Sequence, residues 1–278
     1  MLLFPFTVCL SQPTSWTTKG IGGGGAVFAP SISPFNSNKV FMACDMSDFF
    51  YSYDFGTNWT MQHYQNTTAF HNTIVRFTND SNICYTLRNI GTGYVPIKST
   101  NAGMTWFTVT NPASVASNLK CYDLYSNPYR NDQIIVSDKF NVYISNNGGT
   151  SYSAPILTTG AARGLHLAGV FFDSNNTDIY VCTNKGMILS TNGGTNFSSY
   201  LNYTGIDSTN YDIVSFDGAK QNGVIKFIAV TDTLGPPLQT ISALDISEYS
   251  NTYIMRYGST DWVSIHASLP NPSVDRIY

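Results

Sequence analysis

Apolar and polar positions along the chain form a pattern that repeats about every 46 residues. Short apolar runs of strand length alternate with turns rich in Asn, Asp, Ser and Gly, and alternation on this scale predicts β-strands and not helices. In each repeat an apolar strand is followed by an eight-residue turn motif, at 52–59, 99–106, 145–152 and 190–197. The first residues of the motifs are separated by 47, 46 and 45 positions. About four strands per repeat is the content of one β-propeller blade.

The four motifs share the pattern Ser-x-Asp/Asn-x-Gly-x-Thr/Asn/Ser-aromatic. The Asp or Asn side chain is expected to accept a hydrogen bond from the backbone N–H two residues on, and Gly allows the positive φ of a tight turn. The aromatic residue is expected to anchor the hairpin. The structural positions are Ser52, Asp54, Gly56, Trp59, Ser99, Asn101, Gly103, Trp106, Ser145, Asn147, Gly149, Tyr152, Ser190, Asn192, Gly194 and Phe197.

The repeats predict one all-β domain over residues 16–278, a β-propeller of four-stranded blades with about five to six blades present. A fifth, degenerate motif falls at 255–262 and ends in Trp262. Because a propeller closes its ring to protect its edge strands, we expect either an unusual closure or a fragment of a seven-bladed ring, with 269–278 opening another blade. Residues 1–15 are expected to be a leader, either a secretory signal cleaved after Ser11 or an irregular start.

Composition limits the classes of function. The chain has 14 Lys and Arg against 17 Asp and Glu, a net charge of −3, and 11% charged residues where about a quarter is usual. This argues against a nucleic-acid binder or a basic membrane-surface protein. No apolar run approaches the roughly 20 residues of a membrane span. We therefore expect no nucleic-acid partner and no membrane span.

Cysteine and histidine positions predict no metal and no cofactor. Three of the cysteines lie in apolar runs and are expected to be small buried side chains, although a disulfide between neighbouring strands is an alternative. The histidines are not at metal-ligand spacing. The residues concerned are Cys9, Cys44, Cys84, Cys121, Cys182, His63, His71, His166 and His266.

The repeated motif resembles the Asp-box, or BNR, repeat of sialidases, sortilin-type (Vps10) ectodomains and the xyloglucanase propellers of glycoside hydrolase family 74. The resemblance covers roughly residues 16–262. The start of the chain also looks like the opening blade of family 74, with Trp16, Ile21 followed by a glycine run at 22–25, and Asp45. This resemblance implies that Asp45 is a catalytic base. Where the family has small residues after this Asp, the chain has Ser47-Asp48-Phe49-Phe50.

A hydrolase of this type needs a second carboxyl group as the acid. The family draws its acid from a second propeller, so the resemblance supplies half of a catalytic pair. Within this chain the candidates are Asp48, three residues from Asp45, and Asp138, at the end of the matching strand of the third repeat. Both Asp45 and Asp138 are expected to end inner strands and to open toward one face of the ring.

The resemblance implies a secreted, monomeric, carbohydrate-active propeller that acts on a polysaccharide or oligosaccharide of the β-glucan type. A non-catalytic glycan- or protein-binding propeller of the sortilin type is the alternative. A sialidase is disfavoured, since there are only six arginines and a single Glu, Glu248, to serve its chemistry. Six glycosylation sequons suit a secreted protein: Asn58, Asn66, Asn79, Asn175, Asn196 and Asn202.

Overall fold

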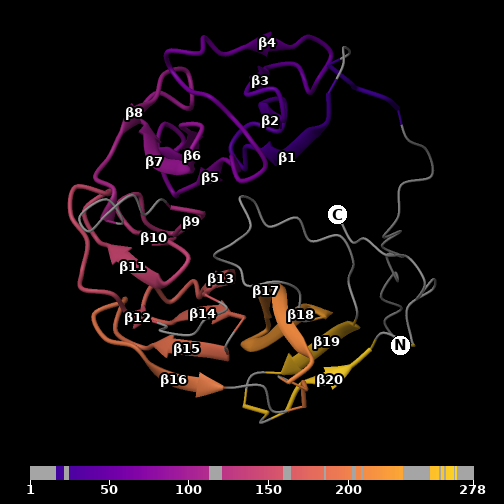
Figure 1. The fold of residues 1–278 in the computed structure, drawn as a ribbon, viewed down its shortest axis with the longest axis vertical. Coiled ribbons are helices and arrows are strands. Elements are labelled where there is room, and N and C mark those ends of the chain that lie inside the picture. Colours follow the sequence, from indigo (N-terminus) through magenta and orange to yellow (C-terminus); the bar gives the residue numbers. More distant parts are fainter. Residues whose placement is uncertain are drawn as a thin grey trace, which may run out of the picture.

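The computed structural model describes residues 17–21, 25–112, 121–158, 164–184, 186–201, 205–207, 209–233, 251–256, 258–259, 261–265 and 267. Its strands form five four-stranded antiparallel sheets that succeed one another around a central axis (Figure 1). The all-β propeller of four-stranded blades predicted from the repeats is confirmed. The expected leader at 1–15, Cys9, Glu248, His266 and the segment 269–278 lie outside the described residues.

Each sheet takes four consecutive strands of the chain. The first sheet contains β1 (Val27–Ile32), β2 (Val40–Cys44), β3 (Phe49–Ser52) and β4 (Thr60–Met61), and the second β5 (Arg76–Phe77), β6 (Cys84–Asn89), β7 (Tyr94–Ser99) and β8 (Phe107–Thr108). The third contains β9 (Asp123–Ser126), β10 (Ile134–Ser137), β11 (Asn141–Ser145) and β12 (Leu157–Thr158). The fourth contains β13 (Leu167–Phe172), β14 (Ile179–Thr183), β15 (Gly186–Ser190) and β16 (Ser198–Leu201). The fifth contains β17 (Tyr211–Gln221), β18 (Val224–Thr233), β19 (Asn251–Arg256) and β20 (Val263–Ser264).

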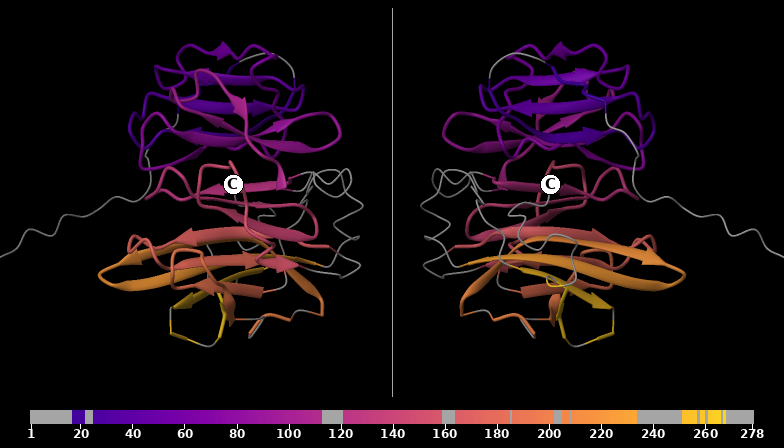
Figure 2. Two further views of the ribbon diagram at one scale, coloured as in Figure 1. Left: turned by 90° about the vertical axis from the view of Figure 1, so that its left-hand side faces the viewer. Right: turned by 90° about the vertical axis from the view of Figure 1, so that its right-hand side faces the viewer.

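The first strand of each sheet lies nearest the axis and the fourth lies at the rim (Figure 1). The apolar strands recognised in the sequence are the second strands, β2, β6, β10 and β14, and therefore not the innermost ones. In the fifth sheet the β17–β18 hairpin, with strands of 11 and 10 residues, projects beyond the neighbouring sheets (Figure 2). The axis is thus lined by strands that precede the recognisable repeat unit.

Four apolar clusters hold successive sheets together, because each draws its buried side chains from two neighbouring sheets. Between the first and second sheets, Phe41 and Phe49 pack edge-on against Trp106 at ring-centroid distances of 6.4 and 6.2 Å. Between the fourth and fifth sheets, the ring centroids of Tyr180 and Phe227 are 5.0 Å apart. Each sheet is therefore stabilised mainly by its immediate neighbours, as in other repeat architectures.

The repeated motif joins the third and fourth strands of the first four sheets. In the first copy the Ser52 hydroxyl accepts hydrogen bonds from the backbone N–H of Asp54 (3.2 Å) and Gly56 (2.8 Å) and donates to Asp54 Oδ1 (2.8 Å). Asp54 Oδ1 also accepts from the Asn58 N–H at 2.7 Å. The expectation that the Asp side chain takes the N–H two residues on is wrong in detail. Serine takes that donor, and the Asp or Asn side chain reaches the N–H four residues on.

The same hydrogen bonds recur in the other three copies. The Gly N–H to Ser Oγ distances are 2.8, 2.9 and 2.9 Å in the second, third and fourth sheets. The four motif serines are almost fully buried, with exposed fractions of 0 or 1%. Each hydroxyl therefore replaces water as the acceptor for two backbone donors that the turn has withdrawn from solvent.

The motif glycine is needed for its backbone conformation and for its contact with the preceding sheet. Two successive residues of each turn have positive φ, for example Ala102 at 60° and Gly103 at 84°. A Cβ on Gly103 would lie 2.5 Å from Phe41 Cζ, and one on Gly194 would lie 2.4 Å from Ile144 Cδ1. Both contacts are to the sheet before, so the turn of one sheet is packed against its predecessor. In the degenerate fifth motif, Trp262 is buried and Gly258 has a φ of 86°.

The four described cysteines are free buried thiols: Cys44, Cys84, Cys121 and Cys182. The alternative of a disulfide between neighbouring strands is wrong for these four. Burial raises the pKa of the Cys84 thiol to about 12 and also raises the pKa of Cys121 and Cys182. These side chains act as small apolar core residues.

Candidate functional site

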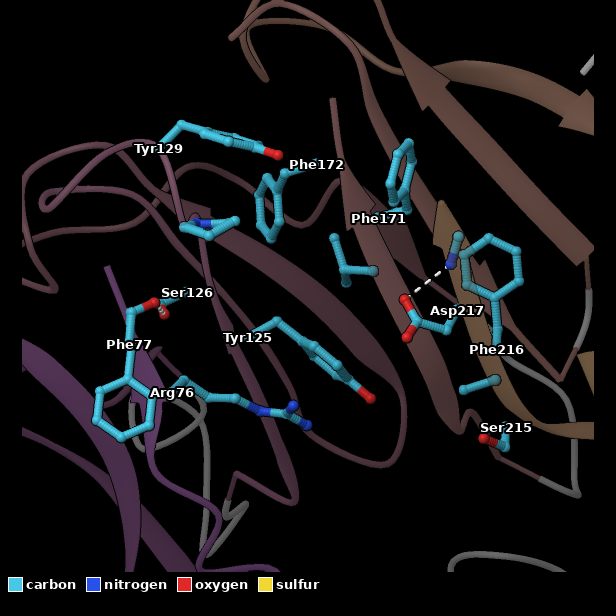
Figure 3. Close-up of a pocket in the computed structure, with 14 residues that line it drawn as sticks. Arg76, Phe77, Tyr125, Ser126, Tyr129, Phe171, Phe172, Ser215, Phe216 and Asp217 are labelled. Atoms are coloured by element: carbon cyan, nitrogen blue, oxygen red, sulfur yellow. Dashed lines mark hydrogen bonds between the residues drawn. The ribbon is translucent and has the colours of Figure 1, made fainter. Parts of the chain in front are cut away.

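A cavity with a volume of about 490 Å³ lies on the axis (Figure 3). We call it the axial cleft. It is lined by the first strands β5, β9, β13 and β17 and by the turn after β9. Its lining residues are Arg76, Phe77, Tyr125, Ser126, Pro128, Tyr129, Ala168, Val170, Phe171, Phe172, Ser215, Phe216, Asp217 and Gly218.

Arg76 is fixed at one side of the axial cleft by its neighbour in the third sheet. Its Nε donates to the Leu124 carbonyl at 3.1 Å, and its guanidinium carbon lies 4.2 Å from the centroid of the Tyr125 ring. A cation over an aromatic face is favourable, particularly where water is partly excluded. The side chain is therefore held flat on the wall, with its orientation set by two contacts.

Asp217 faces Arg76 and Tyr125 from the fifth sheet. Its side chain is exposed in the cleft, and its Oδ1 accepts a hydrogen bond from the Gly218 N–H at 2.7 Å. Figure 3 shows the Asp217 carboxylate and the Tyr125 hydroxyl pointing toward the same part of the cleft from opposite walls. Burial raises the pKa of Tyr125 to about 12; Arg76 opposes this shift, while Asp123 and Asp217 add to it. Tyr125 is therefore a neutral hydroxyl that can donate and accept hydrogen bonds.

A second, smaller cavity of about 90 Å³ lies toward the other end of the axis. Arg76 and Tyr125 line it as well, so they separate the two cavities. The rest of its wall is His71, Asn72, Ile74, Tyr122, Asp123 and Leu124. The axial cleft lies toward the turns between first and second strands, whereas this cavity lies toward the turns between second and third strands.

His166 lies behind Asp123 at this second end. Its Nε2 is 2.8 Å from the Val214 carbonyl oxygen, which can only accept, so Nε2 is the donor. Its buried Nδ1 has no hydrogen-bond partner and is 4.0 Å from Asp123 Oδ2. That carboxylate also accepts a hydrogen bond from the Ser137 hydroxyl at 2.7 Å. Asp123 is therefore engaged with Ser137 and makes no ion pair with Arg76.

Asp45 and Asp48 lie in the connection between β2 and β3, at the end of the molecule opposite the axial cleft. Asp45 is half-buried; its Oδ1 accepts from the Ala26 N–H at 3.1 Å, and its carboxylate leaves no room for a Cβ on Gly25, which would lie 2.7 Å away. The end of the predicted glycine run is therefore packed on this Asp. Asp48 is half-buried in the same connection.

Asp138 is buried in the turn between β10 and β11, and its oxygens are occupied by that turn. Oδ1 accepts from the backbone N–H groups of Phe140 (2.7 Å) and Asn141 (2.6 Å), and Oδ2 accepts from the Tyr143 hydroxyl at 3.3 Å. Asp138 therefore stabilises the turn between β10 and β11. Since Asp45 and Asp138 follow β2 and β10, both end second strands and not the inner strands expected from the sequence.

Sequence reasoning missed the residues that line the axis. Tyr125, Phe171 and Asp217 are separated by 46 and 46 positions (125 to 171, 171 to 217), the period of the repeat. This spacing could have identified them as equivalent positions. Their side chains differ, however, so these positions show no similarity between repeats in the sequence. Arg76 occupies the corresponding strand of the second sheet.

Within the described residues no group of three His, Cys, Asp or Glu side chains could hold a metal ion. The same part of the chain contains no helix with the length and apolarity that crossing a bilayer requires.

No protein-family model and no curated protein matches this sequence. Solved structures do resemble it. An ancestral enzyme of glycoside hydrolase family 74 superimposes with a TM-score of 0.67 at 22% identity, over 92% of this chain and 33% of its own. A family 74 xyloglucanase from Xanthomonas campestris gives 0.61 at 15% identity, over 94% and 40%.

A third structure, the extracellular domain of a putative hybrid two-component system from B. thetaiotaomicron, gives a TM-score of 0.56 at 10% identity, over 84% of this chain and 27% of its own. The chain thus spans 33 to 40% of the length of the two family 74 proteins. At these identities the similarity establishes the fold, which is a β-propeller resembling those of family 74.

Proposed function

We propose that the protein is a carbohydrate-active β-propeller of the Asp-box type that binds a polysaccharide in its axial cleft. The observation that carries the proposal is the composition of that cleft: rings on its walls and a few polar groups, Arg76, Tyr125 and Asp217, that converge on one space. Binding sites for small ligands combine largely apolar walls with a small number of fixed polar groups. The fold similarity to family 74 xyloglucanases agrees with this ligand class.

The polar groups suit a ligand that is rich in hydroxyls. Asp217 offers acceptors, Arg76 offers donors, and Tyr125 offers both. Tyr129, with 40% of its surface exposed, stands at the wall of the cleft where an apolar face of a sugar ring can lie against it. The cleft is open to solvent, which suits a chain polymer better than a small enclosed ligand.

Isothermal titration calorimetry with xyloglucan oligosaccharides and a panel of neutral and acidic polysaccharide fragments tests this proposal. Tyr129→Ala and Asp217→Asn are each expected to weaken binding about ten-fold, equivalent to about 1.4 kcal/mol. Phe107→Ala is the matched control, because Phe107 is 48% exposed but lies on β8 at the rim. If the protein binds none of the fragments, the proposal is contradicted. If it binds but both cleft variants keep the wild-type affinity, the ligand does not bind in the axial cleft.

Hydrolysis is the second candidate function, and the observation in its favour is the placement of Asp45. The Ala26 N–H and the close approach of Gly25 orient this carboxylate at one end of the propeller. With Asp45 as the base, Asp48 or Asp138 would have to supply the acid at a separation of about 6.5–9.5 Å for inversion. Asp48 is the better partner, since the oxygens of Asp138 are taken by its own turn.

Release of reducing ends from β-glucans by the wild type, Asp45→Ala and Asp48→Ala distinguishes the two functions. If the protein is a hydrolase, both variants are expected to lose most of the activity while still binding the glycan. Equal release by wild type and Asp45→Ala removes Asp45 from the mechanism. Binding without any release supports the non-catalytic propeller.

The proposal includes secretion and a monomeric state. Four of the sequon asparagines, Asn58, Asn79, Asn175 and Asn196, are exposed, so a glycosylating enzyme could reach them. Light scattering of the protein secreted by a eukaryotic host, before and after glycan removal, is expected to give the mass of one chain. A dimer mass or an intracellular product contradicts this part.

A further inference from the structure

Arg76 has no counter-ion among the described residues. None of the ion pairs found there includes it, and its two fixed contacts, with the Leu124 carbonyl and the Tyr125 ring, are to uncharged groups. An arginine presents five N–H donors. The Leu124 carbonyl accepts from one of them, the Nε–H of Arg76. A half-buried cation whose charge is unmatched is a binding determinant for an anion.

The carboxylates that line the two cavities beside Arg76 make no ion pair with it. Asp123 lines the second cavity together with Arg76, but its Oδ2 accepts from Ser137 at 2.7 Å and lies 4.0 Å from His166 Nδ1. Asp217 belongs to the opposite wall of the cleft and makes no ion pair with Arg76. The space between Arg76 and Asp217 is therefore bounded by a cation on one side and an acceptor on the other.

We propose that the axial cleft recognises an acidic glycan, a polysaccharide whose sugars carry carboxylates, and that Arg76 binds the carboxylate. This inference rests on the proposed function, because it names the substrate class of the same cleft. The planar guanidinium can bind a carboxylate through two parallel hydrogen bonds. Asp217 accepts hydrogen bonds from the hydroxyls of the same or the next sugar, and Tyr125 both donates to them and accepts from them.

A peptide C-terminus also carries a carboxylate, but the remaining groups favour a sugar. Asp217 can only accept hydrogen bonds, and each ring hydroxyl of a sugar can donate to it while also accepting from Arg76 or Tyr125. An acidic sugar presents a carboxylate and hydroxyls at fixed positions on one ring, and so matches both walls at once.

The test compares galacturonate and mannuronate oligomers with their methyl esters, which have almost the same shape and no charge. Calorimetry at low salt is expected to show the wild type binding the acid at least about ten-fold more tightly than the ester, since hydrogen bonds to charged groups are the stronger ones. In Arg76→Gln this ratio falls to about one. In Arg256→Gln, which removes a charge exposed on β19 outside the cleft, the ratio is retained.

Arg76 also connects the second and third sheets, so thermal unfolding of each variant is measured alongside. If Arg76→Gln does not fold, Arg76→Lys replaces it, because it keeps the charge and loses the paired geometry; the ratio is then expected to fall by several-fold. If neither variant folds, the ratio of the wild-type affinities for the acid and its methyl ester decides the question.

Equal binding of acid and ester by the wild type overturns this inference and leaves the proposed function standing. Binding of neither form also overturns this inference, and it overturns the proposed function only if every other polysaccharide fragment of the panel fails to bind as well. A tripeptide with a free C-terminus, compared with its amide, is the third arm. If the free peptide binds in a manner that depends on Arg76 and no glycan binds, the ligand of the cleft is not a glycan and the inference is overturned.

Discussion

The rim and the axis of this propeller are built on the same repeat but use it in opposite ways. At the rim, four turns have the same serine, the same glycine and Gly N–H to Ser Oγ distances of 2.8 to 2.9 Å. At the axis, positions one repeat apart carry Tyr125, Phe171 and Asp217. The rim repeats what every blade needs in order to fold. The axis differs from blade to blade, as the proposed binding of one ligand by several blades would require.

The largest expected effect is at a rim glycine. Gly103→Ala forces a side chain onto a residue with φ of 84° and places its Cβ 2.5 Å from Phe41, so we expect a loss of about 3 kcal/mol or more in the free energy of unfolding. Gly91→Ala is the control, with φ of 80° and open space around the new Cβ, and is expected to cost about 1 kcal/mol. Urea unfolding followed by tryptophan fluorescence measures both. Equal losses would show that the contact with the preceding sheet is unimportant.

A rim serine is expected to have the next largest effect. Ser145→Ala leaves the backbone N–H groups of Asn147 and Gly149 without their acceptor, at a cost of about 2 kcal/mol. Ser99→Ala and Ser190→Ala should cost the same within about 1 kcal/mol. The exposed Ser153→Ala is the control and should change stability by less than about 0.5 kcal/mol. Unequal losses among the three motif serines would break the equivalence of the turns.

The one acidic copy of the motif makes a pH-dependent difference. Hydrogen bonds from Asn58, first from its backbone N–H and then from its side chain, lower the pKa of Asp54 to about 2. Because the folded-state pKa is depressed, the stabilisation is present above the unfolded-state value of about 4 and is lost as the pH falls toward 2. Asp54→Asn gives this turn the residue of the other three. The wild type should lose stability relative to Asp54→Asn between pH 4 and pH 2, in thermal unfolding at each pH, and parallel curves would contradict this.

The smallest effect on stability is expected at the axis. Asp217 is exposed and makes one hydrogen bond, to its own neighbour, so Asp217→Asn should change the free energy of unfolding by less than about 0.5 kcal/mol. The same change should weaken glycan binding about ten-fold. If Asp217→Asn lowered the free energy of unfolding as much as a Ser→Ala change in a rim turn, the rim and the axis would not differ in their importance for stability.

Most of the fold could be predicted from the repeat. A turn that needs a buried acceptor and a positive φ restricts its residue types strongly, so Ser99, Asn101 and Gly103 keep their identities and reveal the period. The closing aromatic residue is less restricted, since Trp106 is buried between sheets while Phe197 is half-buried. The first strands could not be located in this way. β5 has two residues and β9 has four, and such short strands carry little periodic signal.

The site could be predicted less well, for a related reason. The resemblance to family 74 points to Asp45, but the surroundings of this residue depend on Gly25 and Ala26, which lie 20 and 19 positions earlier in the chain. Arg76, Tyr125 and Asp217 meet only because three sheets converge on the axis. No local pattern marks such residues, because their proximity is a property of the ring.

The contacts of Gly103 and Gly194 with the preceding sheets give the propeller a direction. Gly103 accommodates Phe41, and Gly194 accommodates Ile144, so each of these two turns is shaped to a side chain of its own predecessor. Exchanging two blades, or inserting a copy of one, would set a turn against a side chain of the wrong size even though every blade kept its own hydrogen bonds. The packing at the interfaces thus specifies the order of the blades. A new blade can be added without strain only together with the neighbouring blade whose side chain fits its turn.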